Sequence, residues 1–364
     1  MPQIELRNVT KKFGRKIVVD DLTLTIRNGE FFCLLGPSGS GRTTVLRLIA
    51  GLEKPDSGEI YIDDKLVNDL PPIERDVAMT FETLALYPHL TVYENLAFPL
   101  WKLDLTGDEI KSRVNEVAEM LRIGHLLNRK PAQLSGGERQ RVSLGRALVK
   151  KTSILLLDEP LGHLDAKLRL YARVEIKKIQ KALKQTVVMT AFDSLEAISM
   201  GDRIGVMKDG RILQAGEPAE LYENPKSLFV ATSIGSPPIN TVSCILKEEK
   251  GKIVLSSNGF SINLDKFREV LADKVGSRII LGVRPSDIKV STTPPGIEAS
   301  IYAVEPVGHE TILTLDASGI TLIAKVPQTV AMESGTRVWI EPILERIHLF
   351  DQNEEIIALN RDIK

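Results

Sequence analysis

The stretch GPSGSGRTT, from Gly36 to Thr44, is rich in glycine and small hydroxyl residues. Its spacing matches the phosphate-binding pattern G-x-x-x-x-G-K-[ST], except that Arg42 occupies the lysine position. In such a loop, backbone N–H groups turn toward phosphate oxygens, and the N-terminus of the following helix adds partial positive charge. We expect a nucleotide's phosphates to be contacted by Gly36, Ser38, Gly39, Ser40, Gly41, Arg42, Thr43 and Thr44.

Two acidic residues end the apolar run SILLLDEP, residues 153–160. A carboxylate at the C-terminal end of a buried strand, here Asp158, suits the Mg²⁺ that accompanies a bound nucleotide. The adjacent Glu159 can orient an attacking water. The pair could instead cap the next turn, but the glycine loop elsewhere in the chain favours the nucleotide site.

A third motif, LSGGERQR at residues 134–141, places a hydroxyl residue and two glycines at the start of a predicted helix. This pattern indicates a second helix N-terminus able to bind an anion. One nucleotide rarely needs two such termini from one face of one chain. We therefore expect a dimer in which this motif closes on a nucleotide held by another subunit, although by itself the motif fits an ordinary helix start equally well. The residues concerned are Ser135, Gly136, Gly137 and Glu138.

The elements that must position these motifs follow an alternating pattern typical of an α/β domain with a largely parallel sheet. Buried strands are predicted at FFCLLG, SILLLDEP, TVVMTAF and DRIGVM. Helices are predicted at TTVLRLIAGL, DEIKSRVNEVAEMLRI, GGERQRVSLGRALVKK and DAKLRLYARVEIKKIQKALK.

A domain boundary is predicted near residue 235, where the composition turns to Pro, Gly, Ser and Asn. The first domain would span residues 1–235 and the second 236–364. The second region consists of short, partly alternating apolar runs, which predict a small antiparallel barrel of OB type. These runs are KIVLSS, FSINL, SRIILGV, EASIYAVEPV, ETILTLDA, ITLIAKV and TRVWIEPI.

Bulk composition limits the possible partners. The 364 residues carry a formal net charge of −1, which leaves no broad basic surface for nucleic acid. Cys33 and Cys244 lie far apart in sequence, and we expect unpaired thiols in a reducing compartment. No apolar run is long enough to span a bilayer, and the N-terminus lacks a signal-peptide pattern. We expect a chain that is soluble and cytoplasmic.

With these motifs in hand, the chain resembles the ATP-binding subunits of ABC importers, in the sugar-type group related to the maltose importer ATPase. The resemblance covers nearly the whole length and implies a P-loop ABC ATPase domain followed by a small all-β, OB-like barrel of TOBE type, which would add dimer contacts. The motifs that carry it are GPSGSGRTT, FETLALYPHLTVYENLAF, LSGGERQR, LLLDEP with LGHLDAKLR, GVRPSDI and VEPVGHET.

The resemblance also implies roles for individual residues toward ATP and Mg²⁺. Phe13 would stack on adenine, and Glu159 would polarise the attacking water. Thr43 and Asp158 would serve Mg²⁺, with Glu82 at the third metal-associated position. Ser135 and Gly137 would meet the γ-phosphate of the ATP bound by the opposite subunit.

Further partners follow from the same resemblance. The segment ALYPHLTV would receive two membrane permease subunits through Leu86, Tyr87 and Pro88, unless it is a surface loop with stray aromatics. An extracytoplasmic binding protein would deliver the solute, and the subunit would lie on the cytoplasmic face of the inner membrane. The implied cargo is a carbohydrate, a polyol or a glycerol-type solute, which this subunit does not touch.

Three departures from the family pattern fall on one nucleotide site. The family has lysine, glutamine and histidine where this chain has Arg42, Glu82 and Ala191. A planar guanidinium cannot replace a compact ammonium without shifting the phosphates. Glu82 adds negative charge near a developing negative transition state, and Ala191 lacks the hydrogen-bond donor of the switch histidine. We therefore expect weak or absent hydrolysis at the chain's own site.

Because LSGGERQR is intact, this chain could still complete a competent site on a partner, which predicts a heterodimer with a non-identical ATPase subunit. Two alternatives stay open at this point. One is a homodimer that hydrolyses ATP slowly, and the other is a non-hydrolysing regulatory or scaffold subunit. A nucleic-acid-associated ABC protein is disfavoured, because such proteins carry two ATP-binding domains and the second half here has no phosphate loop.

Overall fold

The computed structural model describes residues 2–162, 164–328 and 332–357. His163, in the LGHLDAKLR segment, lies outside the described residues. The chain divides into two compact units, Met1–Pro218 and Ala219–Lys364. Helix α8 (Leu228–Ser233) therefore belongs to the second unit, whereas a division at residue 235 assigns it to the first domain. That division stays a prediction.

The first unit is built on a six-stranded sheet with the order β10-β9-β3-β8-β7-β6. Its strands pair in parallel except for β10, which runs antiparallel to β9 at the edge. All four predicted strands of this domain are confirmed. The bounds are β3 (Phe31–Leu35), β6 (Val77–Thr80), β7 (Ile154–Asp158), β8 (Thr186–Ala191), β9 (Arg203–Lys208) and β10 (Arg211–Gly216).

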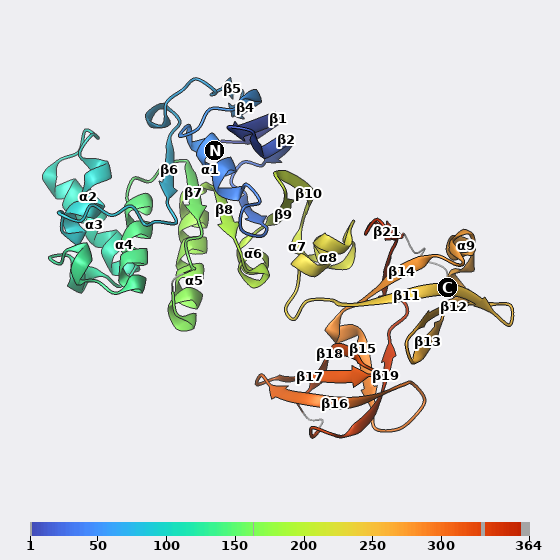
Figure 1. Cartoon of the computed structure of the whole chain (residues 1–364). Helices are drawn as coiled ribbons and strands as arrows, with labels where there is room; N and C mark the ends of the chain where they lie inside the picture. The colour runs from blue at the N-terminus through green and yellow to red at the C-terminus, as the bar shows by residue number, and fades with distance from the viewer. Residues whose placement is uncertain (1, 163, 329–331, 358–364) are drawn as a thin grey trace. The chain divides into compact units, whose positions relative to one another are not determined.

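Helices begin where the sequence supplies capping residues. Thr91, Thr106 and Ser135 each form a capping box with a glutamate three residues later, so that two backbone N–H groups find partners. The four predicted helices are confirmed, and Figure 1 shows α2, α3 and α4 grouped beside the β6 edge of the sheet. The bounds are α1 (Arg42–Ala50), α2 (Val92–Ala97), α3 (Gly107–Met120), α4 (Gly136–Leu148), α5 (Ala166–Leu183) and α6 (Ser194–Met200).

A second, antiparallel sheet in the first unit was not predicted from the sequence. Its strand order is β2-β1-β4-β5, and its apolar side chains share one buried cluster with α1 and with the parallel sheet. Helix α1, which follows the glycine loop, is thereby fixed by packing against both sheets. The bounds are β1 (Ile4–Phe13), β2 (Lys16–Ile26), β4 (Ser57–Ile62) and β5 (Lys65–Leu66).

The second unit is mostly β, as predicted, and every predicted run forms a strand. Its two antiparallel sheets have the orders β13-β12-β11-β14-β20-β21 and β15-β19-β16-β17-β18, and both contribute to one apolar core. Short helices α7 (Pro218–Glu223) and α9 (Arg268–Leu271) accompany α8. The strands are β11 (Asn240–Glu249), β12 (Lys252–Ser257), β13 (Phe260–Asn263), β14 (Arg278–Val283), β15 (Ile288–Ser291), β16 (Ile297–Pro306), β17 (Glu310–Ala317), β18 (Ile320–Pro327), β19 (Arg337–Pro342), β20 (His348–Phe350) and β21 (Ile356–Ile357).

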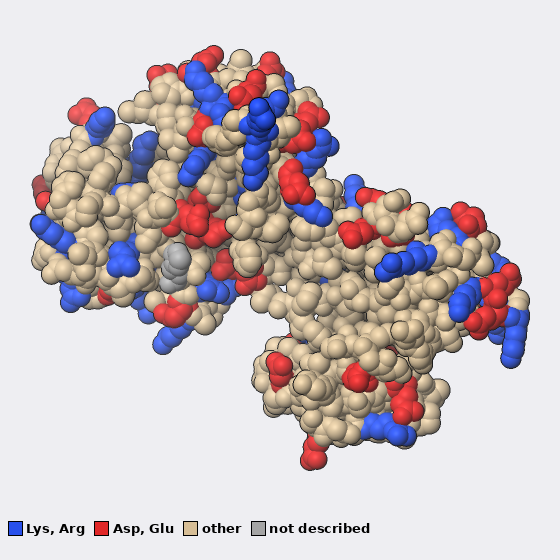
Figure 2. All heavy atoms as spheres, in the orientation of Figure 1, with Lys and Arg blue, Asp and Glu red and all other residues tan. Residues whose placement is uncertain are grey.

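Surface and thiol properties can be read directly. No helix among the described residues is long and apolar enough to cross a membrane. Acidic and basic side chains are interspersed over the face of the first unit seen in Figure 2. Cys33 and Cys244 are both buried free thiols, and burial raises the pKa of Cys244 to about 11.

Candidate ATP site

The predicted site residues converge on one edge of the parallel sheet. Strands β3, β8, β7 and β6 are consecutive neighbours, and parallel strands present their carboxyl ends on the same side. The glycine loop follows β3, Asp158 ends β7 and Ala191 ends β8, while Glu82 follows β6. Ligands of open α/β sheets bind at this edge, so the topology supports a nucleotide site here.

The glycine loop between β3 and α1 forms a close-fitting turn. A Cβ on Gly36 would collide with the backbone carbonyl of Met207, and one on Gly41 would collide with the carbonyl of Val18. Gly41 also has a φ of 104° and caps α1 without a side-chain hydrogen bond, so the first amides of that helix lack a side-chain cap. The loop therefore needs glycine at both positions.

Ser40 provides a direct test of whether this loop fits a phosphate. Its side chain is only 3% exposed, and its Oγ has no hydrogen-bond partner among the described residues. Buried hydroxyl groups are normally paired. This orphaned hydroxyl lies next to the N-terminus of α1, where the helix amides lack a side-chain cap. Such a concentration of unsatisfied polar groups fits a loop that binds the phosphates of ATP, whereas Ser38 and Gly39 are exposed at the tip of the loop.

Arg42 reaches from the loop to the ends of β7 and β8. Its Nη2 donates to Glu159 Oε1 at 3.0 Å, and its Nη1 donates to the carbonyl oxygen of Ala191. The side chain is 6% exposed. Burial lowers the pKa of Arg42, and the carboxylates of Glu159, Asp158 and Glu82 oppose that shift. The structure thus brings two of the three departures into contact with each other and with the predicted water-polarising glutamate.

Thr43 and Asp158 form the candidate Mg²⁺ position. The Thr43 hydroxyl donates to Asp158 Oδ1 at 3.0 Å. Burial raises the pKa of Asp158, hydrogen bonds from Thr190 and Thr43 lower it, and the Glu82 carboxylate raises it further. A buried carboxylate beside a hydroxyl suits a hard cation. No group of three or more His, Cys, Asp and Glu side chains in the described part of the chain could hold a metal by itself.

Two threonines that orient the acidic pair were missed at the sequence level. Thr190 donates to Asp158 Oδ1 at 2.8 Å and accepts the Glu159 N–H at 2.9 Å, while Thr80 accepts the Asp158 N–H at 3.0 Å. Thr80 ends β6 and Thr190 is the last residue but one of β8, and both strands are neighbours of β7. A lone hydroxyl at the end of an apolar run, as in VVMTA, is the signal that could have found them.

Glu159 itself lies in a sharp turn. Its φ is 45°, in the left-handed region that costs a residue with a side chain. Gln140 of α4 donates through Nε2 to the carbonyls of Pro160 at 2.7 Å and of Glu159 at 3.3 Å. Glu82 is exposed in the segment after β6, close enough for its charge to act on Arg42 and Asp158.

The LSGGERQR motif opens α4, as predicted. Ser135 caps the helix, its Oγ accepting the Glu138 N–H at 3.3 Å, while the Ser135 N–H donates to Glu138 Oε2 at 2.7 Å. Hydrogen bonds from the backbone N–H and the hydroxyl of Ser135 to the Glu138 carboxylate lower the pKa of Glu138. The structure gives no hydrogen bond between Ser135–Glu138 and the glycine loop, so the roles of Ser135, Gly136, Gly137 and Glu138 toward a second subunit stay predictions.

Two more groups of predicted residues are positioned but not tested. Phe13 is 46% exposed at the end of β1, with Lys11 Nζ at 5.2 Å from its ring centroid. Leu86, Tyr87 and Pro88 lie between β6 and α2. An exposed aromatic ring is available for stacking, and the adenine and permease roles remain predictions.

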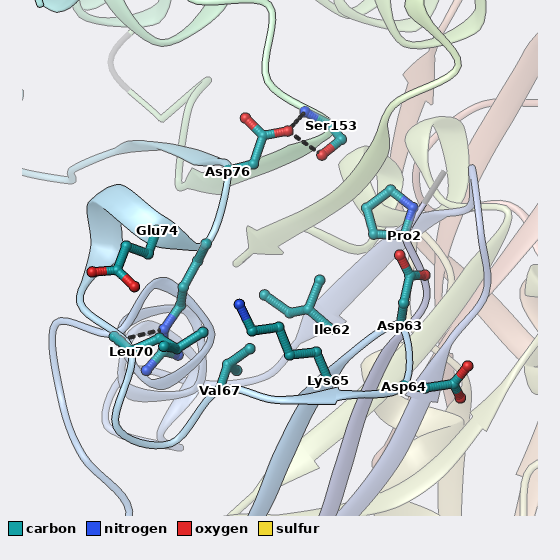
Figure 3. A pocket seen from close by; sticks show the side chains of 11 residues that line it. Pro2, Ile62, Asp63, Asp64, Lys65, Val67, Leu70, Glu74, Asp76 and Ser153 are labelled. Atoms are coloured by element: carbon teal, nitrogen blue, oxygen red, sulfur yellow. Dashed lines mark hydrogen bonds between the residues drawn. The ribbon is translucent and has the colours of Figure 1, made fainter.

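A pocket of about 790 Å³ lies elsewhere in the first unit. Figure 3 shows Asp76 and Ser153 at one side of it, with Asp76 accepting the Ser153 N–H at 3.0 Å, and Ile62 and Val67 at the other. Asp76 precedes β6 and Ser153 precedes β7. This pocket therefore lies at the amino ends of those strands, away from the acidic pair, and is not the nucleotide site.

Comparison with known families covers both units. Residues 19–162 match the family described as ABC transporter. Residues 235–288 match the MalK OB fold domain, and residues 281–350 match the TOBE domain.

Individual relatives align over almost the whole chain. The trehalose/maltose import ATP-binding protein MalK of Thermococcus litoralis is 44% identical over 97% of this chain and 98% of its own length. The osmoprotective compounds uptake ATP-binding protein GgtA of Synechocystis sp. is 42% identical over 98% and 99%. The maltose/maltodextrin import ATP-binding protein MalK of Aliivibrio fischeri is 42% identical over 96% of each chain.

Among solved structures, the dimeric post-hydrolysis ATP-binding cassette MJ0796 bound to ADP and Pi is similar to the first part of the chain. Its TM-score is 0.56 at 36% identity, over 59% of this chain and 98% of that chain. The same cassette in a second dimeric structure gives a TM-score of 0.56 at 37% identity over the same shares.

Proposed function

The chain belongs to the ATP-binding subunits of ABC transporters, and we propose that it energises import of a carbohydrate, a polyol or a glycerol-type solute. The cargo class is supported by the names of its relatives, which concern trehalose, maltose, maltodextrin and osmoprotective compounds. The subunit would act on the cytoplasmic face of the inner membrane, beneath two permease subunits, with an extracytoplasmic binding protein delivering the solute.

We propose further that the chain binds ATP but hydrolyses it weakly or not at all at its own site. The observation that carries this proposal is the contact of Arg42 with both Glu159 and the Ala191 carbonyl. A glutamate paired with a buried guanidinium is a poorer acceptor for a water proton, and the same pairing would compete with any contact of Arg42 to the phosphates. Ala191 offers no side-chain donor, and loss of one preorganised donor costs about 10²–10³ in rate.

The residues that would hold the nucleotide remain in place. Backbone amides of the glycine loop and of the start of α1 would contact phosphate, and Phe13 would stack on adenine. Thr43 and Asp158 would hold Mg²⁺, with Glu82 nearby, and the cation would supply charge neutralisation at the phosphates. Binding without efficient hydrolysis is therefore the expected behaviour of this site.

Helix α4 would take part in ATP hydrolysis at a second site, held by another subunit. Its N-terminus, with Ser135, Gly136 and Gly137, would complete the ATP site of a second, non-identical ATPase subunit. In such a heterodimer ATP binding closes the pair, and hydrolysis at the partner's site reopens it. The capping box at Ser135 supports this proposal, because it keeps the start of α4 ordered in the isolated chain.

The test is ATP hydrolysis by the purified full chain, alone and mixed with a second ATPase subunit from the same gene cluster. We expect no turnover alone, turnover in the mixture, and collapse of the mixture's rate with Ser135→Arg. Thr106→Arg is the matched control, because Thr106 caps α3 with the same capping box outside the motif. That variant should leave the mixture active.

Other outcomes select the alternatives. Robust turnover by the isolated chain indicates a homodimer with a working site, and the impaired-site proposal is then wrong. A chain that neither turns over ATP nor activates any partner is a regulatory or scaffold subunit. A further arm, Arg42→Lys with Ala191→His, should raise the chain's own turnover by about 10²–10³-fold if the substitutions cause the impairment.

A further inference from the structure

The segment between β6 and α2 has an unusual backbone. Leu84 and Ala85 are consecutive residues with φ angles of 62° and 45°, and neither is glycine. The left-handed region is unfavourable for a residue with a Cβ, and two such residues in succession persist only where their surroundings hold them. The groups that hold them therefore control the shape of this segment.

Helix α4 supplies those groups. Arg146 Nη1 donates to the Ala85 carbonyl at 2.6 Å, and Nη2 donates to the Leu84 carbonyl at 3.4 Å. The Ser143 hydroxyl donates to the same Leu84 carbonyl at 3.0 Å. One turn of α4 thus binds the carbonyl oxygens of both left-handed residues.

The surroundings strengthen these contacts. Ser143 is 3% exposed, and the Arg146 guanidinium also lies 5.3 Å from the centre of the Tyr87 ring. Burial lowers the pKa of Arg146. Hydrogen bonds from an ionised donor are about twice as strong as neutral ones, and shielding from water increases this difference.

The other end of the segment is held by α2. Asn95 is fully buried, and its Oδ1 accepts the Tyr87 N–H at 2.9 Å. Its Nδ2 lies within hydrogen-bonding distance of the carbonyls of Tyr87, Leu90 and Thr91, at 3.1, 3.2 and 2.9 Å. Residues 86–88 are therefore suspended between an anchor on α4 and an anchor on α2.

Helix α4 also begins at Ser135, the proposed contact with the partner's nucleotide. Arg146 lies eleven residues further along, about 16 Å at 1.5 Å per residue. We propose that Arg146, assisted by Ser143, is a positioning residue that fixes residues 84–88 to α4, so that the LSGGERQR motif and the permease-contact segment move as one body. Its importance for transport rests on the proposed function, whereas the tether itself does not.

The tether can be tested in the full chain by hydrogen exchange. The amides of Leu84, Tyr87 and Leu90 are hydrogen-bonded, and Arg146→Gln should speed exchange in peptides covering 83–90 by about tenfold or more. Arg146→Lys, which can reach only one of the two carbonyls, should give an intermediate rate. If Arg146→Gln fails to fold, Ser143→Ala removes one hydrogen bond and should still speed exchange there.

The matched control is Arg141→Gln on the same helix. Arg141 also donates to backbone carbonyls, but to those of Leu121 at 3.1 Å and Arg122 at 3.3 Å. It should speed exchange around residue 122 and leave 83–90 unchanged. Equal exchange in 83–90 for wild type and Arg146→Gln overturns the proposal.

Coupling is tested in the reconstituted complex with the permease subunits and the partner ATPase. Arg146→Gln should lower solute-stimulated ATP turnover at least severalfold while KM for ATP stays unchanged, with partial recovery in Arg146→Lys. Lys151→Gln, which removes only an ion pair with Glu116 outside the motif, should keep full stimulation. Full stimulation of Arg146→Gln overturns the coupling role. Absence of stimulation in the wild-type complex instead contradicts the proposed function, and the exchange result still decides the tether.

Discussion

Arg42 contacts one member of the acidic pair at the end of β7. In a phosphate loop the cation serves the phosphates, but here it is bound to Glu159 and to the Ala191 carbonyl. Arg42 and Ala191 stand where the family pattern has lysine and histidine. The two residues are linked in the structure, because the Arg42 guanidinium donates to the backbone carbonyl of Ala191. The two substitutions therefore act as a unit, and their effects on rate should not multiply.

Asp158 allows a prediction about stability. Burial in the folded state raises the pKa of Asp158 above its ordinary value, so protonated Asp158 is favoured in the folded state. That contribution is fully present below the unfolded pKa and is lost as the pH rises through the folded pKa. At neutral pH the buried carboxylate costs stability, and Asp158→Asn should raise the thermal midpoint of the nucleotide-free chain by a few degrees.

The same variant should lose the extra stabilisation that Mg²⁺ adds to ATP, measured as the shift of the midpoint with and without the cation. Asp76→Asn is the control. Asp76 is exposed and precedes β6, at the amino end of the parallel strands, whereas Asp158 lies at the carboxyl end of β7. It should show no rise in midpoint and a normal Mg²⁺ response. A lower midpoint for nucleotide-free Asp158→Asn would contradict the sign argued here.

At the scale of elements, β3, the glycine loop and β9 pack closely together. Packing of α1 against both sheets fixes the helix direction, and the loop must pass close to the Met207 carbonyl on β9. The N-terminus of α1 is therefore aimed by contacts that lie outside the GPSGSGRTT motif itself.

Gly36→Ala tests this constraint. The added Cβ would meet a backbone carbonyl, which cannot move like a flexible side chain, so we expect a loss of about 1–3 kcal/mol in unfolding free energy. The measurement is urea denaturation of the full chain, in which the unfolding transition of the first unit is monitored. Gly107→Ala, with open space around the new Cβ at the start of α3, should be neutral or slightly stabilising. Equal midpoints for the two variants would exclude the steric argument.

At the scale of the whole chain, helices α7 and α8 make hydrogen bonds and apolar contacts with the rest of the second unit. In the second unit, Arg284 is 1% exposed and donates to the carbonyls of Tyr222 at 2.9 Å and Ala231 at 2.8 Å. Burial lowers the pKa of Arg284 to about 10. Ala231 also packs in an apolar cluster with Ile239 and Phe350. The segment around α7 and α8 is therefore part of this fold.

Comparing the stabilities of fragments 219–364 and 236–364 tests whether α7 and α8 are part of this fold. The shorter one exposes Phe350 and Ile239 and loses the carbonyls that bind Arg284, so its unfolding free energy should be lower by roughly 3 kcal/mol. Urea titration followed by the fluorescence of Trp339, which is the tryptophan that both fragments contain, measures the difference. Equal stabilities would support a domain boundary at residue 235.

Much of the fold follows from local sequence patterns. The buried strands, the long helices and the mostly β second unit were predicted because apolar periodicity and capping residues act over a few positions. The antiparallel sheet of β1, β2, β4 and β5 was missed, since exposed residues interrupt the apolar pattern of its strands. Its β1–β2 and β4–β5 pairs are hairpins, but the β1–β4 pairing that joins them connects segments far apart in sequence.

The candidate site likewise combines motifs that the local sequence predicts with contacts that only the tertiary structure shows. GPSGSGRTT, the Asp158 and Glu159 pair, and LSGGERQR are local patterns, so the sequence alone determined that a nucleotide-binding α/β unit is present. Only the tertiary structure decided that Arg42 contacts Glu159, that Thr190 orients the acidic pair and that Arg146 holds Leu84 and Ala85. Each of these contacts joins residues brought together by the order of strands and the packing of helices, and such long-range neighbours leave no periodic signal in a single sequence.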